Sequence, residues 1–173
     1  MLNLIIAANN YQKALSNYTC IFFLGTGDKC NANSCYKFVK TGNTWDENQD
    51  SCKAKGGDLV SMETEAEWNF INSEIQQITL PGYNEWHIGL IKQGTWKWVS
   101  GKPLTIEKWQ RYEPSGDGNV AVMSKDYPPG SQGLFNDLKG IYPKPFICEM
   151  TSGKIIKQVR LLMVLRNKLS VAV

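Results

Sequence analysis

The pattern of hydrophobic and polar positions predicts two helices followed by a series of short strands. The first helix is expected to begin after Thr44, which can form a capping box with Glu47 three residues later. Gly56-Gly57 ends this helix, because glycine accepts the left-handed backbone conformation at a helix exit. The residues at helical spacing on its inner face are Trp45, Asn48 and Cys52.

A second capping box predicts the second helix. Thr64 and Glu67 have the same spacing as the first pair, and Pro81-Gly82 closes the region. An apolar stripe follows the capping box at helical spacing. It consists of Trp68, Ile71 and Ile75.

The remainder of the chain is typical of short strands. Trp86, Ile88 and Leu90 alternate with His87 and Gly89, so His87 is expected to point away from the core. A Gly-, Pro- and Asp-rich stretch of this length inside a compact domain is usually functional. That stretch runs from 111 to 133, and the further strands are expected at 95–99, 119–123, 134–136 and 146–149.

Two helices followed by strands favour the α+β fold class. Hydrophobic residues make up 42% and charged residues 20%, which is ordinary for a globular protein. We expect three parts: a poorly defined amino-terminal segment at 1–29, one domain at 30–150 and a basic tail at 151–173.

The net charge of +3 comes from the tail. Five bases and no acid lie after Gly153, which leaves 14 bases and 16 acids in the remainder. A slightly acidic body argues against nucleic acid as a partner. The tail fits either a basic amphipathic helix for an anionic membrane surface or a loose extension. Its longest apolar run, Leu161–Leu165, is too short to span a bilayer, and no other run in the chain is long enough.

The cysteines indicate disulfides rather than zinc. There are five, none in a Cys-x-x-Cys pair, and the chain has one histidine. Widely spaced cysteines suit an oxidising compartment, and Asn17-Tyr18-Thr19 is a possible N-glycosylation acceptor. We therefore expect an extracellular or secreted glycoprotein, although Met1–Ala8 is a poor signal peptide.

An ordered set of short motifs is similar to the C-type lectin-like domain family. The set covers roughly 30–150, and each motif alone is weak while their order is specific. The matching segments are Cys35-Tyr36-Lys37-Phe38, Gly57-Asp58-Leu59-Val60-Ser61, Trp86-His87-Ile88-Gly89-Leu90, Trp96 to Leu104, Glu113-Pro114-Ser115, Phe135-Asn136-Asp137 and Phe146-Ile147-Cys148-Glu149.

This resemblance implies two helices flanking small antiparallel sheets, with a long calcium-binding loop region. It also implies a disulfide from Cys52 to Cys148, and an amino-terminal pair of Cys30 with Cys35 for which Cys20 is a competitor. The family's second bridge is missing, because its positions fall near Asn119 and Gly140. We expect this loss to leave the loop region less restrained.

The resemblance also implies a Ca²⁺ site. Calcium takes six to eight oxygen ligands, several of them charged. The ligands carried over are Glu113, Ser115, Asp117, Asn136 and Asp137, and Pro114 is expected to take a cis peptide bond. Asp117 replaces the family's usual glutamate after a shortened loop.

In lectins of this family the ion binds two adjacent sugar hydroxyls. The residues implied to contact the sugar here are Glu113, Ser115, Asn136 and Asp137. Glu-Pro at this place favours mannose-type sugars, but Ser115 stands where the mannose-binding pattern has asparagine. A serine hydroxyl is a shorter and weaker ligand than an amide.

Other interpretations accompany the lectin hypothesis. Glu, Asp and Asn in a Gly-rich loop are often only solvated turn residues. The fold could also bind a cell-surface protein without calcium, since a fold does not fix a function. Enzymatic activity is not expected, because no catalytic group with an orienting partner can be named. Most of the six tryptophans are expected to pack in the core rather than to stack on sugars.

Overall fold

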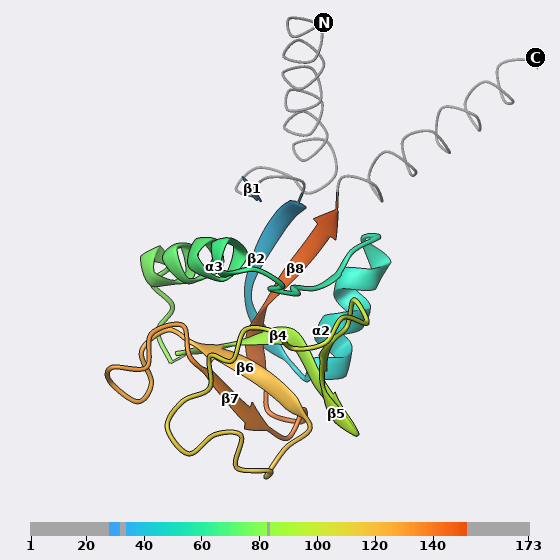
Figure 1. Ribbon diagram of the computed structural model, residues 1–173. Coiled ribbons are helices and arrows are strands. Elements are labelled where there is room, and N and C mark those ends of the chain that lie inside the picture. The colour runs from blue at the N-terminus through green and yellow to red at the C-terminus, as the bar shows by residue number, and fades with distance from the viewer. Residues whose placement is uncertain (1–27, 32–33, 83, 152–173) are drawn as a thin grey trace, which may run out of the picture.

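The computed structural model describes residues 28–31, 34–82 and 84–151 (Figure 1). The predictions made for Asn17, Cys20 and the basic tail lie outside the described residues. The elements, in chain order, are β1 (Lys29–Asn31), β2 (Ser34–Asn43), α2 (Trp45–Ala54), β3 (Asp58–Leu59), α3 (Glu65–Gln77), β4 (Glu85–Gln93), β5 (Thr95–Trp98), β6 (Val120–Ser124), β7 (Phe135–Leu138) and β8 (Lys144–Thr151).

Both helices begin where the capping boxes predict. The Thr44 hydroxyl accepts from the Glu47 N–H, and the Glu47 carboxylate accepts from the Thr44 N–H. Thr64 and Glu67 repeat the exchange at the start of α3. These reciprocal bonds satisfy backbone donors that have no partner within a helix.

The strands form one mixed sheet. Its order is β1-β2-β8-β4-β6-β7, with β3 paired to β8 and β5 paired to β4. All pairings are antiparallel except the contact of β4 with β8, where His87 lies opposite Phe146. The long strands near the two ends of the domain, β2 and β8, run side by side (Figure 1). The α+β fold class is confirmed, with the strands joined in one sheet rather than in separate small sheets.

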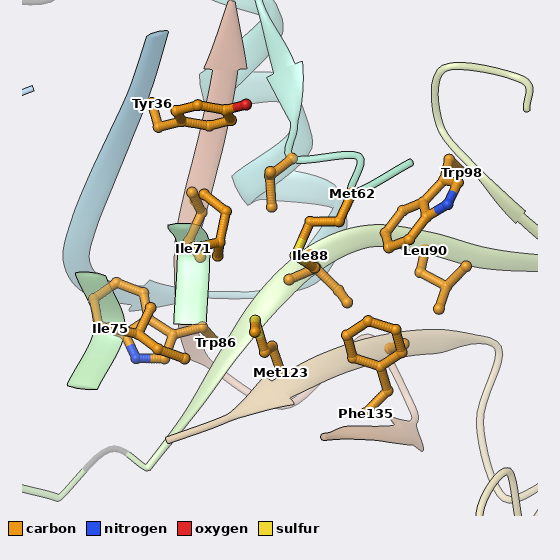
Figure 2. Packing of buried hydrophobic residues seen from close by; sticks show 13 residues of the cluster. Tyr36, Met62, Ile71, Ile75, Trp86, Ile88, Leu90, Trp98, Met123 and Phe135 are labelled. Atoms are coloured by element: carbon orange, nitrogen blue, oxygen red, sulfur yellow. The ribbon is translucent and has the colours of Figure 1, made fainter. Parts of the chain in front are cut away.

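Two apolar clusters form the core, and the larger one fills the space between α3 and the sheet (Figure 2), while the smaller one includes Trp45 and Cys52 of α2. Ile71 and Ile75 of α3 are fully buried in the larger cluster, as the apolar stripe predicts. Trp86 and Trp98 are also fully buried, and Trp98 meets Phe135 edge to face. The other tryptophans pack at or beside the two clusters: Trp45, Trp68, Trp96 and Trp109. The prediction that the tryptophans serve the core is therefore confirmed.

The prediction that His87 points outward is wrong. Its side chain is completely buried, and its Nδ1 lies 2.8 Å from the Asn48 amide nitrogen on α2. The alternation rule fails because both faces of β4 are covered, one by the large cluster and the other by α2. Burial, and secondarily the charge of Lys144, lowers the pKa of His87 to about 3.

The disulfide between Cys52 and Cys148 is confirmed. It joins α2 to β8 across 96 residues of sequence, and both cysteines are buried. The expected Cys30–Cys35 bridge is wrong. Their sulfurs lie 3.3 Å apart across β1 and β2, but Cys30 is free and Cys35 is bonded in another disulfide. A sulfur forms one disulfide at a time, so Cys35 has no bond to offer Cys30.

Candidate functional site

The candidate site lies in the long loop that precedes β6, and β7 positions this loop. Gln110 N–H donates to the Phe135 carbonyl at 2.9 Å, and Phe135 N–H donates to the Lys108 carbonyl at 2.6 Å. Trp109, between them, meets the Phe135 ring edge to face and lies 4.9 Å from the Trp96 ring. The start of the loop is thus fixed against the aromatic part of the core.

A tight turn then carries the chain out to the surface. Glu113 N–H donates to the Gln110 carbonyl at 3.0 Å. Tyr112, inside this turn, has a φ of 70°, and it is the one non-glycine residue with positive φ in the part of the chain that the structure describes. The Glu113–Pro114 peptide bond is cis, as the resemblance predicts.

Asp137 is the anchor of the loop. Its carboxylate is almost completely buried, and Oδ1 accepts from the Ser115 N–H at 2.7 Å. Oδ2 accepts from the N–H groups of Gly116 at 3.1 Å and Gly118 at 3.2 Å. The Ser115 hydroxyl adds a longer bond of 3.4 Å to Oδ1. One carboxylate therefore accepts from three of the four backbone N–H groups between Ser115 and Gly118, in a loop that has no strand partner.

The close approach of the loop to β7 requires glycine at position 118. A Cβ added there would lie 1.9 Å from the carbonyl carbon of Leu138, and this backbone atom cannot move aside as a flexible side chain could. By contrast, a Cβ on Gly116 would meet no atom within 4 Å. Gly118 thus lets the loop reach Asp137, and Gly116 serves only the turn, with a φ of 85°.

Glu113 lies against the same carboxylate. Its Oε2 accepts from the Ser115 N–H at 2.7 Å, and Asp137 Oδ1 accepts from the same N–H at 2.7 Å, so the two carboxyl groups share one donor. Burial, and then the adjoining Asp137 carboxyl group, raises the pKa of Glu113, and hydrogen bonds with Ser115 oppose the rise. A buried acidic group, a half-buried acidic group and an exposed hydroxyl therefore lie close together where the loop meets β7.

The structure does not bring all five predicted ligands together. Asn136 and Asp137 are neighbours on β7, so their side chains point to opposite faces of the strand. The Asn136 amide donates to Glu85 Oε1 at 3.3 Å, and Glu85 is also paired with Lys144 at 2.6 Å. Asp117 is exposed, and its carboxylate makes no hydrogen bond or ion pair with any described residue.

Sequence reasoning missed Glu85 as the residue that holds Asn136. Glu85 is buried at the start of β4, and the family-like segment Trp86 to Leu90 begins only at the next residue. An acidic residue just before an apolar strand is a signal that could have marked it. Because Glu85 carries an ion pair with Lys144, its charge is compensated within the protein.

Three of the five predicted ligands lie close together, and their oxygen atoms suit a hard cation. Glu113, Ser115 and Asp137 offer carboxylate and hydroxyl oxygens, which are the ligands that calcium prefers. The two adjoining carboxyl groups repel each other when both are ionised, and a bound cation would relieve that repulsion. No group of three or more His, Cys, Asp or Glu side chains is placed to hold a metal within the described ranges. Three residues therefore form the core of the site, and further ligands would come from elsewhere.

A disulfide-closed α+β domain with a long loop that presents acidic groups beside its last strands is the architecture of a C-type lectin-like domain. The sequence matches the Lectin C-type domain family over residues 41–150, and the chain belongs to this family. Domains of this family bind carbohydrate or protein and are not enzymes. The chain is thus a C-type lectin-like carbohydrate-recognition domain.

Several known proteins are similar to this chain. C-type lectin domain family 4 member E from Mus musculus is 33% identical over 68% of the chain and 55% of its own length. The structure titled SPL-1–GlcNAc complex has a TM-score of 0.65 at 22% identity, covering 72% of this chain and 93% of that one. SPL-2 from Saxidomus purpuratus, titled as a Ca²⁺-independent C-type lectin, also has a TM-score of 0.65, at 23% identity over 72% of this chain and 91% of that one.

The chain spans about half the length of the mouse relative. The two solved structures are less than 25% identical to it, so they establish the fold alone. No helix among the described residues is both long enough and apolar enough to cross a membrane.

Proposed function

We propose that this domain binds carbohydrate through a calcium ion held by Glu113, Ser115 and Asp137. The observation that supports this proposal is that the carboxyl groups of Glu113, on the loop, and of Asp137, on β7, both accept from the Ser115 N–H at 2.7 Å. Like charges are rarely brought together at a surface without a compensating cation, and neither group is paired with Lys or Arg among the described residues. A bound calcium ion would supply that positive charge.

Each residue has a separate task in this proposal. When bound, the ion would provide open coordination positions for two neighbouring sugar hydroxyls. Asp137 is the buried anchor that keeps the loop in place, and Glu113 and Ser115 lie at the exposed edge, where they can exchange hydrogen bonds with the same hydroxyls. The Glu113-Pro114 sequence favours mannose-type sugars over galactose. Ser115, with a shorter side chain than asparagine, predicts weak binding to single sugars.

The test is retention of the full chain on immobilised mannose and on immobilised galactose, in millimolar calcium. Retention on mannose that ends on addition of EDTA is expected. Glu113→Gln and Asp137→Asn each remove one negative charge at nearly constant shape, so both variants should pass through the column. Asp50→Asn is the matched control, because Asp50 is an exposed acid on α2 and should leave retention unchanged.

The outcomes separate cleanly. Calcium-dependent retention lost in both site variants but kept in the control supports the proposal. Retention that persists in EDTA contradicts the dependence on calcium, but it still supports carbohydrate binding. Absence of retention on either sugar, with the variants and the wild type all folded, contradicts both parts.

A calcium-independent domain that binds a protein partner is the second candidate function. It is favoured by one observation: both oxygens of Asp137 already accept backbone N–H groups, which can take the place of a cation. The Asn136 amide likewise already donates a hydrogen bond to Glu85. SPL-2, which shares the fold, is titled Ca²⁺-independent. Under this alternative, calcium would change neither the melting temperature nor the partner affinity.

An extracellular location belongs to the same proposal. The buried Cys52–Cys148 disulfide forms readily only in an oxidising compartment. A glycan-binding function also places the site where surface glycans occur. Recovery of the chain from the medium of secreting cells, with this disulfide intact by peptide mapping, is the expected result.

A further inference from the structure

Tyr112 is the most exposed large hydrophobic residue among those described, at 81% of its possible surface. It also has the φ of 70° noted above, a conformation that is unfavourable for a bulky side chain. The core gains nothing from an exposed ring, and glycine would accept this backbone without penalty. A strained and exposed aromatic residue at a candidate site points to a role in binding.

Arg111 lies over the Tyr112 ring. The centre of its guanidinium group is 4.7 Å from the ring centroid. This stacking orders both side chains and covers one face of the ring at most, so a large part of the ring stays open to a ligand. Arg111 forms no ion pair with any described acid. Its N–H donors, arranged in a planar fork, remain free for an anion.

Both residues directly precede the candidate calcium site in the sequence. Tyr112 directly precedes Glu113, inside the turn closed by the hydrogen bond from Glu113 N–H to the Gln110 carbonyl. The Gln110 side chain in turn donates to the Tyr127 carbonyl of the neighbouring loop at 3.1 Å. The backbone that carries the ring and the guanidinium is therefore fixed directly before Glu113 by these hydrogen bonds.

We infer that Arg111 and Tyr112 form a subsite for a second sugar residue that carries a sulfate or another anionic group. The apolar face of that sugar stacks on the Tyr112 ring, and its anionic group pairs with the Arg111 guanidinium. The inference rests on the proposed function, because the first sugar is held at Glu113 and Ser115. The domain would accordingly prefer an anionic disaccharide to a neutral monosaccharide.

The test compares three probes in calcium by calorimetry: methyl α-mannoside, mannobiose and sulfated mannobiose. Tyr112→Gly removes the ring at a position that suits glycine, so the melting temperature should not fall. This variant should bind both disaccharides about fivefold more weakly than the wild type and methyl mannoside equally well. Tyr142→Ala is the matched control, because Tyr142 is half exposed on the β7–β8 turn.

Arg111→Gln separates the charge from the ring. It should abolish the preference for sulfated over neutral mannobiose, expected to be about fivefold in the wild type, and leave methyl mannoside binding unchanged. Wild-type binding of methyl mannoside with no gain from a second residue or from sulfate overturns the subsite alone. No binding of any probe overturns the proposed function and the subsite together. Equal affinities in Tyr112→Gly and wild type for all three probes also overturn the subsite.

Discussion

Two regions of this domain, which we call the closed half and the loop region, are held together in different ways. The closed half, consisting of β2, α2, β3 and β8, has a disulfide and a continuous set of strand pairings. The loop region, residues 104–119 and 125–134, has no disulfide in the part of the chain described, and one buried carboxylate gathers its central turn. The disulfide lies in the closed half, and Glu113 and Ser115 of the candidate site lie in the loop region, beside Asp137 on β7. A ligand can therefore act on the loop region without disturbing the core.

Removing the disulfide should have the largest effect on the closed half. We expect the double variant Cys52→Ala with Cys148→Ala to lose about 4–5 kcal/mol in free energy of unfolding, because the bridge closes a loop of nearly a hundred residues. Urea unfolding measures the loss. Cys30→Ser is the control, since Cys30 is a free thiol, and it should change stability by less than about 1 kcal/mol. Equal losses in the two variants would show that Cys30 is bonded in solution.

A methyl group at Gly118 should break the loop region. Gly118→Ala places a Cβ against the Leu138 backbone, so the loop must move away from Asp137 at a cost of about 2–3 kcal/mol. Gly116→Ala, where the space is open, should cost about 1 kcal/mol through its positive φ alone. Sugar retention and urea unfolding of both variants check this difference. Similar results for the two glycines would contradict the close approach of the loop to β7.

The buried His87, on β4 beside α2 of the closed half, should make the domain sensitive to acid. Its pKa is about 3 in the folded protein and near 6.5 when unfolded, so the unfolded state binds a proton first as pH falls. The contribution of neutral His87 to the free energy of unfolding is present well above pH 6.5 and is lost progressively as the pH falls. At pH 5 the loss is about 2 kcal/mol. The measurement is urea unfolding at pH 7 and pH 5 for wild type and His87→Gln. A wild type that loses no more than the variant would contradict the buried, neutral state of His87.

Asp117→Asn should have the smallest effect. Asp117 is exposed and makes no contact with described residues, so its replacement should change the free energy of unfolding by less than about 0.5 kcal/mol. Calcium titration of the variant and of the wild type then compares their calcium affinities. A large loss of calcium affinity would show that Asp117 turns inward as a ligand when the ion binds.

Local rules predicted the framework of the fold from particular residues. Thr44 and Thr64 cap the helices, and Cys52 bonds Cys148, because these features depend on short spacings or on a family pattern. His87 was misplaced, since no local pattern tells a strand buried on both faces from one buried on a single face. For Cys30, sequence spacing alone could not decide which of two sulfurs bonds Cys35.

The candidate site was predictable in its residue types and only partly in its geometry. Glu113, Ser115 and Asp137 come together, and the cis Pro114 was also foreseen. Asn136 faces Glu85 instead, a consequence of strand alternation and of an ion pair 59 residues apart in sequence. Long-range partners of this kind leave no local trace in a single sequence.

The most direct test of the central claim is the melting temperature of the full chain in millimolar calcium and in EDTA. If the Glu113 and Asp137 carboxylates take the ion, binding to the folded state adds about 2.7 kcal/mol at a hundredfold excess over Kd, which raises the melting temperature by several degrees. The rise should vanish when Glu113→Gln and Asp137→Asn are combined. An unchanged melting temperature at every calcium concentration would contradict the claim.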